Sequence, residues 1–354
     1  VPRLDYSDGG CPVLLTEPQS TNLAKWSEDF SNSVWIKNRS SFTLNSIISP
    51  DGNLIMGYLT EDATASNTHY IRRLETITDG IEYTFSVFAK AKERTIISLG
   101  DNAAAQINTG VWFDLYNGVI LTQKAGYIGK IENYGNGIYR CSVTYTGKAA
   151  RQYFDIAMSE SDGVNVYTGD GTSGIYIWGA QLEQQSYPTS YIKTEGTTVT
   201  RNADVVTGAG DVTTFNSQEG VLYAEIAALA NDNTYRNISI SDGTLYNAVI
   251  FSFTNTDNKV NAVLRSGGSG YGNLFHTLTD IKTFNDYVIV WKSGEFTLYV
   301  NGINEITQSF SETPISLSEL SFNNVSSAPF YGKTKALKVY KSIAEAQADL
   351  PYIN

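Results

Sequence analysis

The chain has 354 residues and a formal net charge of −11, from 25 Lys and Arg against 36 Asp and Glu. This acidic balance without basic blocks excludes nucleic acid as a partner, and no apolar run approaches the roughly 18 residues that span a bilayer, so no membrane insertion is expected. Two cysteines and two histidines are too few for a disulfide-stapled scaffold or for a Cys- or His-rich metal centre.

The first half of the chain alternates apolar and polar residues with a period of two, which is the pattern of strands that bury one face. In the stretch 82–90, Tyr83, Phe85 and Val87 share one face. The same alternation recurs over residues 110–118, 139–146 and 152–158. Asp-Gly and Asn-Gly pairs between these stretches predict turns. Many short strands at regular spacing predict a β-sandwich or barrel rather than an α/β fold.

Residues 194–220 are rich in Thr, Gly and Asn and indicate a junction between domains. Strand patterns resume after it, over residues 221–226, 237–241, 247–253, 260–265, 287–292 and 296–300. Ser342 and Glu345 have the spacing of a capping box, which predicts a helix over 342–350. We therefore expect two β-domains, at residues 1–206 and 215–354, joined by a linker at 207–214. The chain starts at Val1, and we expect it to be a piece of a longer protein or a processed product.

Eight segments of the first domain carry a family resemblance. They are residues 2–6 (PRLDY), 11–23 (CPVLLTEPQSTNL), 26–30 (WSEDF), 83–90 (YTFSVFAK), 137–143 (GIYRCSV), 177–183 (IWGAQLE), 187–192 (YPTSYI) and 200–204 (TRNAD). Together they resemble a module that recurs in bacteriophage tail-fibre and head-fibre proteins. That module is similar to the jelly rolls of carbohydrate-binding modules, so the resemblance implies a jelly roll over residues 1–206.

The second domain carries a resemblance of its own, in residues 220–225 (GVLYAE), 240–244 (ISDGT) and 296–302 (FTLYVNG). These segments resemble a concanavalin A-like lectin sandwich of the laminin-G type. Together the two resemblances imply an all-β protein of two β-sandwich domains that serves as a phage fibre or receptor-binding protein. They imply display on the virion surface after assembly in the bacterial cytoplasm. The implied partners are host-surface or mucosal glycans and other virion proteins, with a homotrimer as the expected assembly.

Two sequence patterns bear on enzymatic activity, and neither supports it. Residues 169–174 fit G-x-G-x-x-G, but a strand pattern follows them where a dinucleotide site needs a helix. Glycoside hydrolysis needs two facing carboxylates, and the nearest approach, Glu219 and Glu225, is six residues apart with Val221 and Tyr223 between them on the same face. We therefore expect no enzymatic activity, and a polysaccharide-degrading enzyme is kept as the less favoured alternative.

No cofactor is required by this interpretation. Jelly-roll sugar modules often hold one structural calcium near the first and last strands, and calcium takes oxygen ligands. By their position in the chain, Glu17 and Glu183 are the candidate calcium ligands that the resemblance implies.

Sugar recognition uses aromatic rings that stack on the apolar face of the sugar and polar side chains that bind its hydroxyls. Seven such residues of the first domain point away from the predicted core: Phe88, Trp112, Asp114, Tyr116, Arg140, Tyr153 and Asp155. We predict that they form a glycan-binding face, with Trp112 as the leading stacking residue. The alternative is that this face packs against a neighbouring subunit or the second domain, which would make the chain a purely structural virion module.

Overall fold

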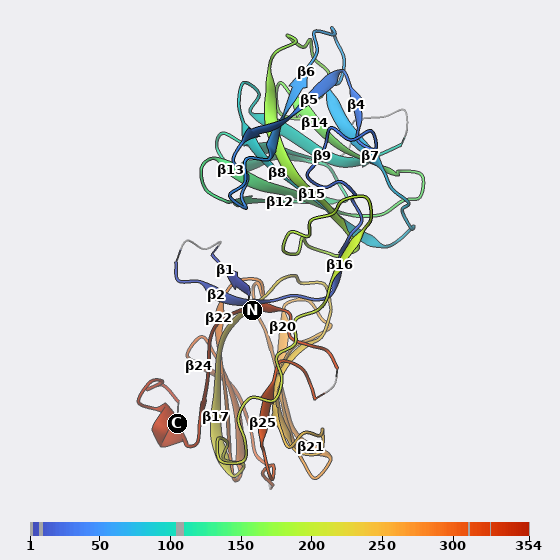
Figure 1. Ribbon diagram of the computed structural model, residues 1–354. Coiled ribbons are helices and arrows are strands. Elements are labelled where there is room, and N and C mark those ends of the chain that lie inside the picture. Colours follow the sequence, from blue (N-terminus) through green and yellow to red (C-terminus); the bar gives the residue numbers. More distant parts are fainter. Residues whose placement is uncertain (1–2, 7–9, 104–109, 311, 326, 354) are drawn as a thin grey trace. The chain divides into compact units, whose positions relative to one another are not determined.

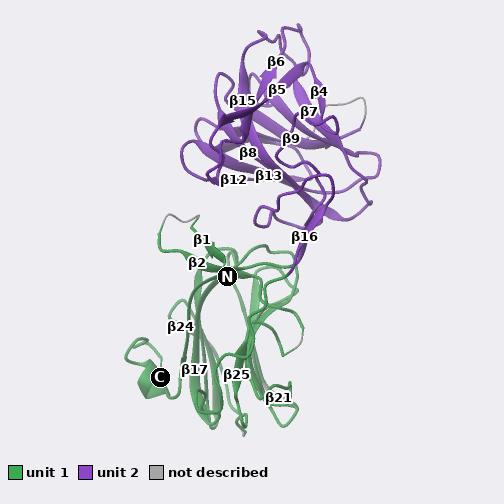
Figure 2. Ribbon diagram, in the orientation of Figure 1, with its two compact units in different colours: residues 1–18, 203–354 green, residues 19–202 purple. Residues whose placement is uncertain are grey.

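The computed structural model describes residues 3–6, 10–103, 110–310, 312–325 and 327–353 (Figure 1). The chain divides into two compact units: unit 1 comprises residues 1–18 and 203–354, and unit 2 comprises residues 19–202 (Figure 2). Both units are built from antiparallel sheets, so the predicted all-β fold with two β-sandwich units is confirmed. Within the described residues, no helix has the length and apolar character needed to span a membrane.

The start of the chain belongs to unit 1, whereas the sequence predicts that it belongs to the first domain. Strand β1 (Arg3–Asp5) pairs with β2 (Val13–Thr16), and β2 pairs with β26 (Gly332–Tyr340) near the end of the chain. The hydroxyl of Thr16 strengthens this pairing by donating to the carbonyl of Phe330 at 3.0 Å. Along the sequence, unit 2 is therefore inserted between β2 and the rest of unit 1. Residue alternation cannot reveal this insertion, because pairing between distant strands leaves no local pattern.

The described strands of unit 1 form a seven-stranded sheet and a five-stranded sheet. In spatial order, the first is β1, β2, β26, β17 (Glu219–Ala228), β22 (Asn285–Lys292), β23 (Glu295–Val300) and β24 (Ile303–Gln308). The second is β21 (Ser269–Thr277), β20 (Lys259–Ser266), β19 (Ala248–Phe253), β18 (Arg236–Ser241) and β25 (Glu319–Ser321). Leu222, Val249 and Leu298 come from both sheets and are buried in one core cluster, so the two sheets pack face to face.

One short helix follows β26, at the predicted place. In α1 (Ile343–Ala346), the hydroxyl of Ser342 caps the helix by accepting a hydrogen bond from the backbone N–H of Glu345 at 3.1 Å, and the Glu345 carboxylate accepts from the backbone N–H of Lys341 at 2.9 Å. The helix ends before the predicted residue 350, because the chain turns so that Leu350 and Ile353 pack with Ile343 against the outer face of the seven-stranded sheet.

The described part of unit 2 contains two six-stranded sheets and a two-stranded ribbon. In spatial order, the sheet called here the β9 sheet is β11 (Val119–Gln123), β10 (Val111–Asp114), β9 (Ile96–Asn102), β14 (Tyr153–Ser159), β7 (Tyr70–Leu74) and β4 (Ile36–Asn38). The β8 sheet is β12 (Tyr127–Asn133), β13 (Ile138–Thr146), β8 (Glu82–Ala91), β15 (Gly174–Glu183), β6 (Met56–Glu61) and β5 (Ser40–Ile47). The ribbon pairs β3 (Ser20–Asn22) with β16 (Val199–Arg201).

The core of unit 2 lies between its two sheets and uses the faces that residue alternation predicts. Phe85 and Val143 of the β8 sheet and Phe113 and Phe154 of the β9 sheet are fully or almost fully buried in one cluster. The rings of Phe85 and Phe154 lie 5.7 Å apart, which joins the two sheets directly. The Gly-rich segment 169–174 leads into β15, a strand, so the structural context of a dinucleotide site is not met.

Candidate functional site

Trp112, the predicted leading residue for sugar stacking, lies on β10 with its ring fully buried. Its indole N–H donates to the hydroxyl of Ser159 at 3.1 Å and to the side-chain oxygen of Asn165 at 3.0 Å. Asn165 belongs to the segment 160–167 that follows β14, and this segment folds back over the part of the β9 sheet that carries Trp112. Nζ of Lys124 lies 5.3 Å from the centre of the Trp112 indole ring. The prediction that Trp112 is exposed is therefore wrong, because residue alternation gives the face of a strand but not the loop that covers it.

Tyr153 and Asp155 lie on β14 beside Arg72 of β7, a residue that the sequence analysis did not select. The Arg72 guanidinium donates to both carboxylate oxygens of Asp155, at 2.7 and 3.1 Å. Its Cζ atom lies 4.5 Å from the ring centre of Tyr153 and 4.7 Å from that of Tyr70. Burial raises the pKa of Asp155 to about 6, although the hydrogen bonds and charge of Arg72 lower it.

Asp155 is only 2% exposed, so its ion pair with Arg72 is internal and the predicted exposure of this carboxylate is wrong. Tyr153 is half-buried at the edge of the same cluster. The signal that could have found Arg72 is its place two residues after Tyr70, which puts both side chains on one face of β7.

Phe88 and Arg140 are cross-strand neighbours on the β8 sheet, a different sheet from that of Trp112. The Arg140 guanidinium donates to the carbonyl of Thr189 at 2.7 Å, and the ring of Phe88 meets that of Tyr191 edge-on at 5.9 Å. The segment that follows β15 thus covers both side chains, which are 3% exposed or less. Their predicted exposure is wrong for the same reason as that of Trp112, and the seven predicted residues do not share one surface.

Asp114 and Tyr116 lie at the turn after β10. The carboxylate of Asp114 accepts hydrogen bonds from the backbone N–H groups of Tyr116 at 2.8 Å and Asn117 at 3.1 Å, so it stabilises the turn. The side chain of Tyr116 is 77% exposed and is the most exposed of the predicted seven. Glycan binding by any of these seven residues stays a prediction.

Glu17 and Glu183, the candidate calcium ligands, belong to different units. The Glu183 carboxylate accepts hydrogen bonds from the hydroxyl of Ser20 at 2.5 Å and from the backbone N–H of Thr189 at 3.0 Å. Glu17 lies 3.2 Å from the guanidinium of Arg3. Among the residues that the structure describes, no group of three His, Cys, Asp or Glu is placed to hold a metal ion. Calcium binding by these two glutamates stays a prediction.

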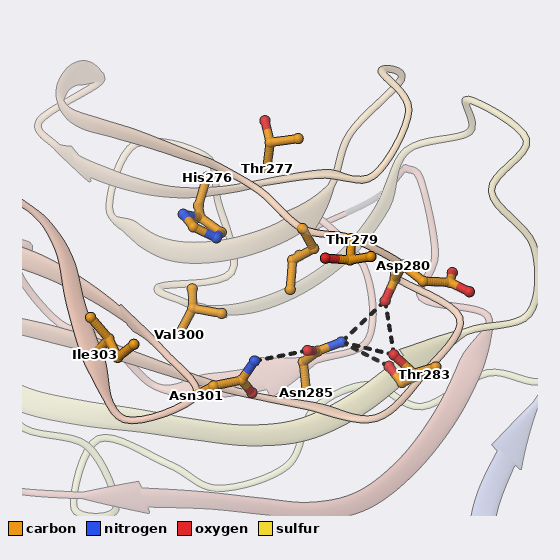
Figure 3. Close-up of a pocket in the computed structure, with 10 residues that line it drawn as sticks. His276, Thr277, Thr279, Asp280, Thr283, Asn285, Val300, Asn301 and Ile303 are labelled. Carbon is orange, nitrogen blue, oxygen red and sulfur yellow. Dashed lines mark hydrogen bonds between the residues drawn. The ribbon is translucent and has the colours of Figure 1, made fainter.

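An open cavity of about 350 Å³ lies in unit 1 (Figure 3). The loop 277–285, which connects β21 to β22, lines one part of it, and the turn 300–303 between β23 and β24 lines another. Because β21 and β22 belong to different sheets, the cavity lies at one end of the sandwich, where the chain crosses between the sheets. The sequence analysis did not select this region. The pattern that could have drawn attention to it is the connector 277–285, which carries several Thr, Asp and Asn side chains.

Side-chain amides hold the loop and the turn together. The Asn285 amide donates to the carbonyl of Thr283 at 2.9 Å and to that of Asp280 at 3.3 Å. The Asn301 amide donates to the side-chain oxygen of Asn285 at 2.9 Å (Figure 3). The side-chain oxygen of Asn301 accepts from the backbone N–H of Asp286 at 2.9 Å. The frame of the cavity is therefore fixed by hydrogen bonds before any ligand arrives.

The cavity wall carries groups that bind neutral ligands by hydrogen bonding. Its polar side chains are hydroxyls, amides, a carboxylate and an imidazole, contributed by Thr277, Thr279, Asp280, Thr283, Asn285, Asn301 and His276. Leu278, Val300 and Ile303 supply its apolar part. Such a mixture of apolar contact and directed donors and acceptors is typical of small-molecule sites.

No protein-family model matches the sequence, and no curated protein matches it. Among solved structures, the chain is similar to sheep galectin-11 in complex with glycerol, with 10% identity and a TM-score of 0.28 over 39% of this chain and 99% of that one. It is also similar to domains LG4-5 of the mouse laminin alpha1 chain, with 12% identity and a TM-score of 0.30 over 78% of this chain and 87% of that one. A third likeness is to truncated AlyQ with CBM32 and alginate lyase domains, with 13% identity and a TM-score of 0.24 over 88% of this chain and 100% of that one. Likenesses of this size assign no function.

Proposed function

We propose that the chain is a non-catalytic carbohydrate-binding protein and that the cavity between the 277–285 loop and the 300–303 turn is its glycan site. The observation that carries the proposal is the set of hydroxyl, amide and carboxylate groups gathered around an open cavity at the end of a β-sandwich. Sugar hydroxyls are both donors and acceptors, and these side chains offer both kinds of partner.

The fixed frame of the cavity favours binding. A site loses affinity when its loops must be ordered by the ligand, and pre-organisation removes that cost. Here Asn285 and Asn301 use their own amides to order the loop and the turn. The hydroxyls of Thr277 and Thr279 lie on exposed residues of the same loop and are positioned to meet a ligand.

Binding is proposed in preference to hydrolysis because of the chemistry that lines the cavity. Glycoside hydrolysis uses two carboxyl groups, one on each side of the scissile bond. Among the described lining residues, Asp280 supplies the one carboxylate, and its neighbours are neutral amides and hydroxyls. These groups hold a sugar in place but are not the general acid and base of a hydrolase.

The proposal also places this glycan-binding chain in a phage fibre, the kind of protein implied by the sequence motifs of the first domain. On a phage fibre displayed on the virion, several copies of a weak glycan site can engage one host surface together, and this multivalency raises their combined avidity. Support for this setting comes from the resemblance of residues 11–23, 83–90 and 177–183 to the fibre module.

A glycan array with the purified full chain tests the proposal, using Ile303→Trp to fill the cavity. Ile303 is 62% exposed, so the larger side chain enters open space without entering a core. We expect Ile303→Trp to lose at least about tenfold in affinity for every glycan bound by the wild type. The matched control is Ile315→Trp, since Ile315 is 56% exposed in the same unit but does not line the cavity. Equal loss in both variants, or glycan binding that survives Ile303→Trp, would place the site elsewhere.

A further inference from the structure

The two sides of the cavity differ in chemistry. Val300, Asn301 and Ile303 lie on one side, and Asp280, Thr283 and Asn285 lie on the other (Figure 3). Val300 is 3% exposed and anchored in β23, whereas Ile303 is 62% exposed and presents its methyl groups to an incoming ligand. A sugar bound here therefore has one edge against the methyl groups of Ile303, beside the Asn301 amide, and the other against the Asp280 carboxylate.

The apolar side discriminates between a hydroxyl and a methyl group on the ligand. A hydroxyl against the methyl groups of Ile303 finds no hydrogen-bonding partner on that side chain, and wherever the contact displaces water this costs free energy. A methyl group in the same place buries apolar surface, which is favourable. Sugars offer such a group in two common forms, as the methyl of a 6-deoxy sugar or as the methyl of an N-acetyl group.

The negative charge of Asp280 on the polar side discriminates between neutral and acidic sugars. Asp280 is the one Asp or Glu among the described lining residues, and none of these residues is Lys or Arg. The nearby ammonium of Lys282 lies 3.7 Å from the Asp280 carboxylate, on a side chain that is 54% exposed and therefore screened by water. A sugar acid would meet Asp280 as a like charge, whereas a neutral sugar can donate a hydroxyl to it.

We infer that the cavity takes an uncharged sugar with an apolar substituent, either a 6-deoxy sugar or an N-acetylated one, with the methyl group against Ile303 and a hydroxyl toward Asp280. This inference rests on the proposed carbohydrate binding at the same cavity. It specifies which edge of the sugar faces which wall, and so which ligands are rejected.

The test is a titration of the full chain, labelled at isoleucine δ1-methyl groups, followed by NMR. The probes are matched pairs: L-galactose with L-fucose, glucose with N-acetylglucosamine, and glucose with glucuronate. We expect the Ile303 methyl resonance to shift and the methyl-bearing sugar to bind about fourfold tighter than its parent, the effect of burying one carbon group. Glucuronate should bind more weakly than glucose, and Asp280→Asn should narrow that difference.

Two variants of Ile303 separate the inference from the underlying proposal. Ile303→Thr keeps a branched side chain but adds a hydroxyl, so the ratio between the affinities for the methyl-bearing sugar and for its parent should fall to about one. Ile303→Val, the matched control, should keep the preference. Equal affinity for both members of every pair, with shifts at Ile303, would overturn the inference and leave carbohydrate binding at the cavity intact. If no sugar shifts the Ile303 resonance, the proposed binding site itself is overturned.

Discussion

The side-chain amide of Asn301 donates to the side-chain oxygen of Asn285 at 2.9 Å and so ties the turn before β24 to the loop before β22. Asn301 has a φ of +50°, in the left-handed region that Asn adopts more readily than most residues. Its side-chain oxygen also accepts from the backbone N–H of Asp286 at 2.9 Å. One residue thus supplies both the backbone conformation of the turn and its bond to the loop.

Replacement of Asn301 tests whether this pair of amides holds the polar side of the cavity. We expect Asn301→Ala to lower the free energy of unfolding of unit 1 by about 1–3 kcal/mol, because it removes two hydrogen bonds and places a Cβ without a polar group in the left-handed region. Hydrogen exchange in peptides that cover residues 277–303 measures the effect locally. Asn301→Gly, which relieves the backbone but also lacks the amide, should recover only part of the protection. Unchanged exchange in both variants would show that the amide pair does not order the cavity.

Replacing Trp112 and Tyr116 in turn tests whether the first is buried and the second is exposed, as their positions on β10 and on the turn after it indicate. Trp112→Ala should cost about 3–5 kcal/mol, because it leaves a large cavity and removes a donor that satisfies Asn165. Tyr116→Ala should stay within about 0.5 kcal/mol of the wild type, since the side chain is 77% exposed. Chemical unfolding of the full chain measures both effects. Trp112→Phe keeps most of the buried volume, and we expect it to retain the glycan affinity of the wild type. Loss of that affinity in a folded Trp112→Phe protein would return the glycan site to unit 2.

Residue alternation predicted the strands and their inward faces well, because a period of two follows directly from strand geometry. Phe85 and Phe154 illustrate this success, since both are assigned to the core by alternation and both are buried between the sheets. Trp112 shows the limit of the method. It does point away from the core between the sheets, yet the segment that contains Asn165 covers it. Whether an outward face is exposed depends on loops, whose path a periodic pattern does not encode.

The cavity in unit 1 was missed for a related reason. Its walls come from a loop and a turn at the open end of the β22–β23 hairpin, and the bond between Asn285 and Asn301 appears only when the pairing of these strands brings them together. The assignment of the first 18 residues fails in the same way, since Thr16 finds its partner Phe330 through long-range pairing. Motif resemblance assigns a segment to a family module but does not identify the strand with which it pairs.

The buried pair of Asp155 and Arg72 should give unit 2 a pH-dependent stability near pH 5. Burial raises the pKa of Asp155 to about 6, above the ordinary value of 3.8 expected in the unfolded chain, so the folded state holds this proton more tightly. The contribution of Asp155 to stability is therefore full below about pH 4 and is lost as the pH rises through about 6. We expect the stability of the wild type relative to Asp155→Asn, whose side chain stays neutral, to fall over this window. Thermal unfolding of both proteins at matched pH values measures this difference, and a difference that does not vary with pH would contradict the raised pKa.

The contacts of Glu183 predict a stabilising role that needs no calcium. Its carboxylate accepts hydrogen bonds from the Ser20 hydroxyl and from the backbone N–H of Thr189, so donors of the protein already surround it. Glu183→Gln turns an NH₂ group toward one of these donors, and we expect a loss of about 1–3 kcal/mol because a buried donor is left without an acceptor. Thermal unfolding of the wild type should be the same with EDTA and with added calcium. Ser20→Ala serves as the control, since it removes one donor but leaves the carboxylate in place, and it should cost less than Glu183→Gln. A calcium-dependent rise in the melting temperature that disappears in Glu183→Gln would instead show that the carboxylate is a metal ligand, as the resemblance to jelly-roll sugar modules implies.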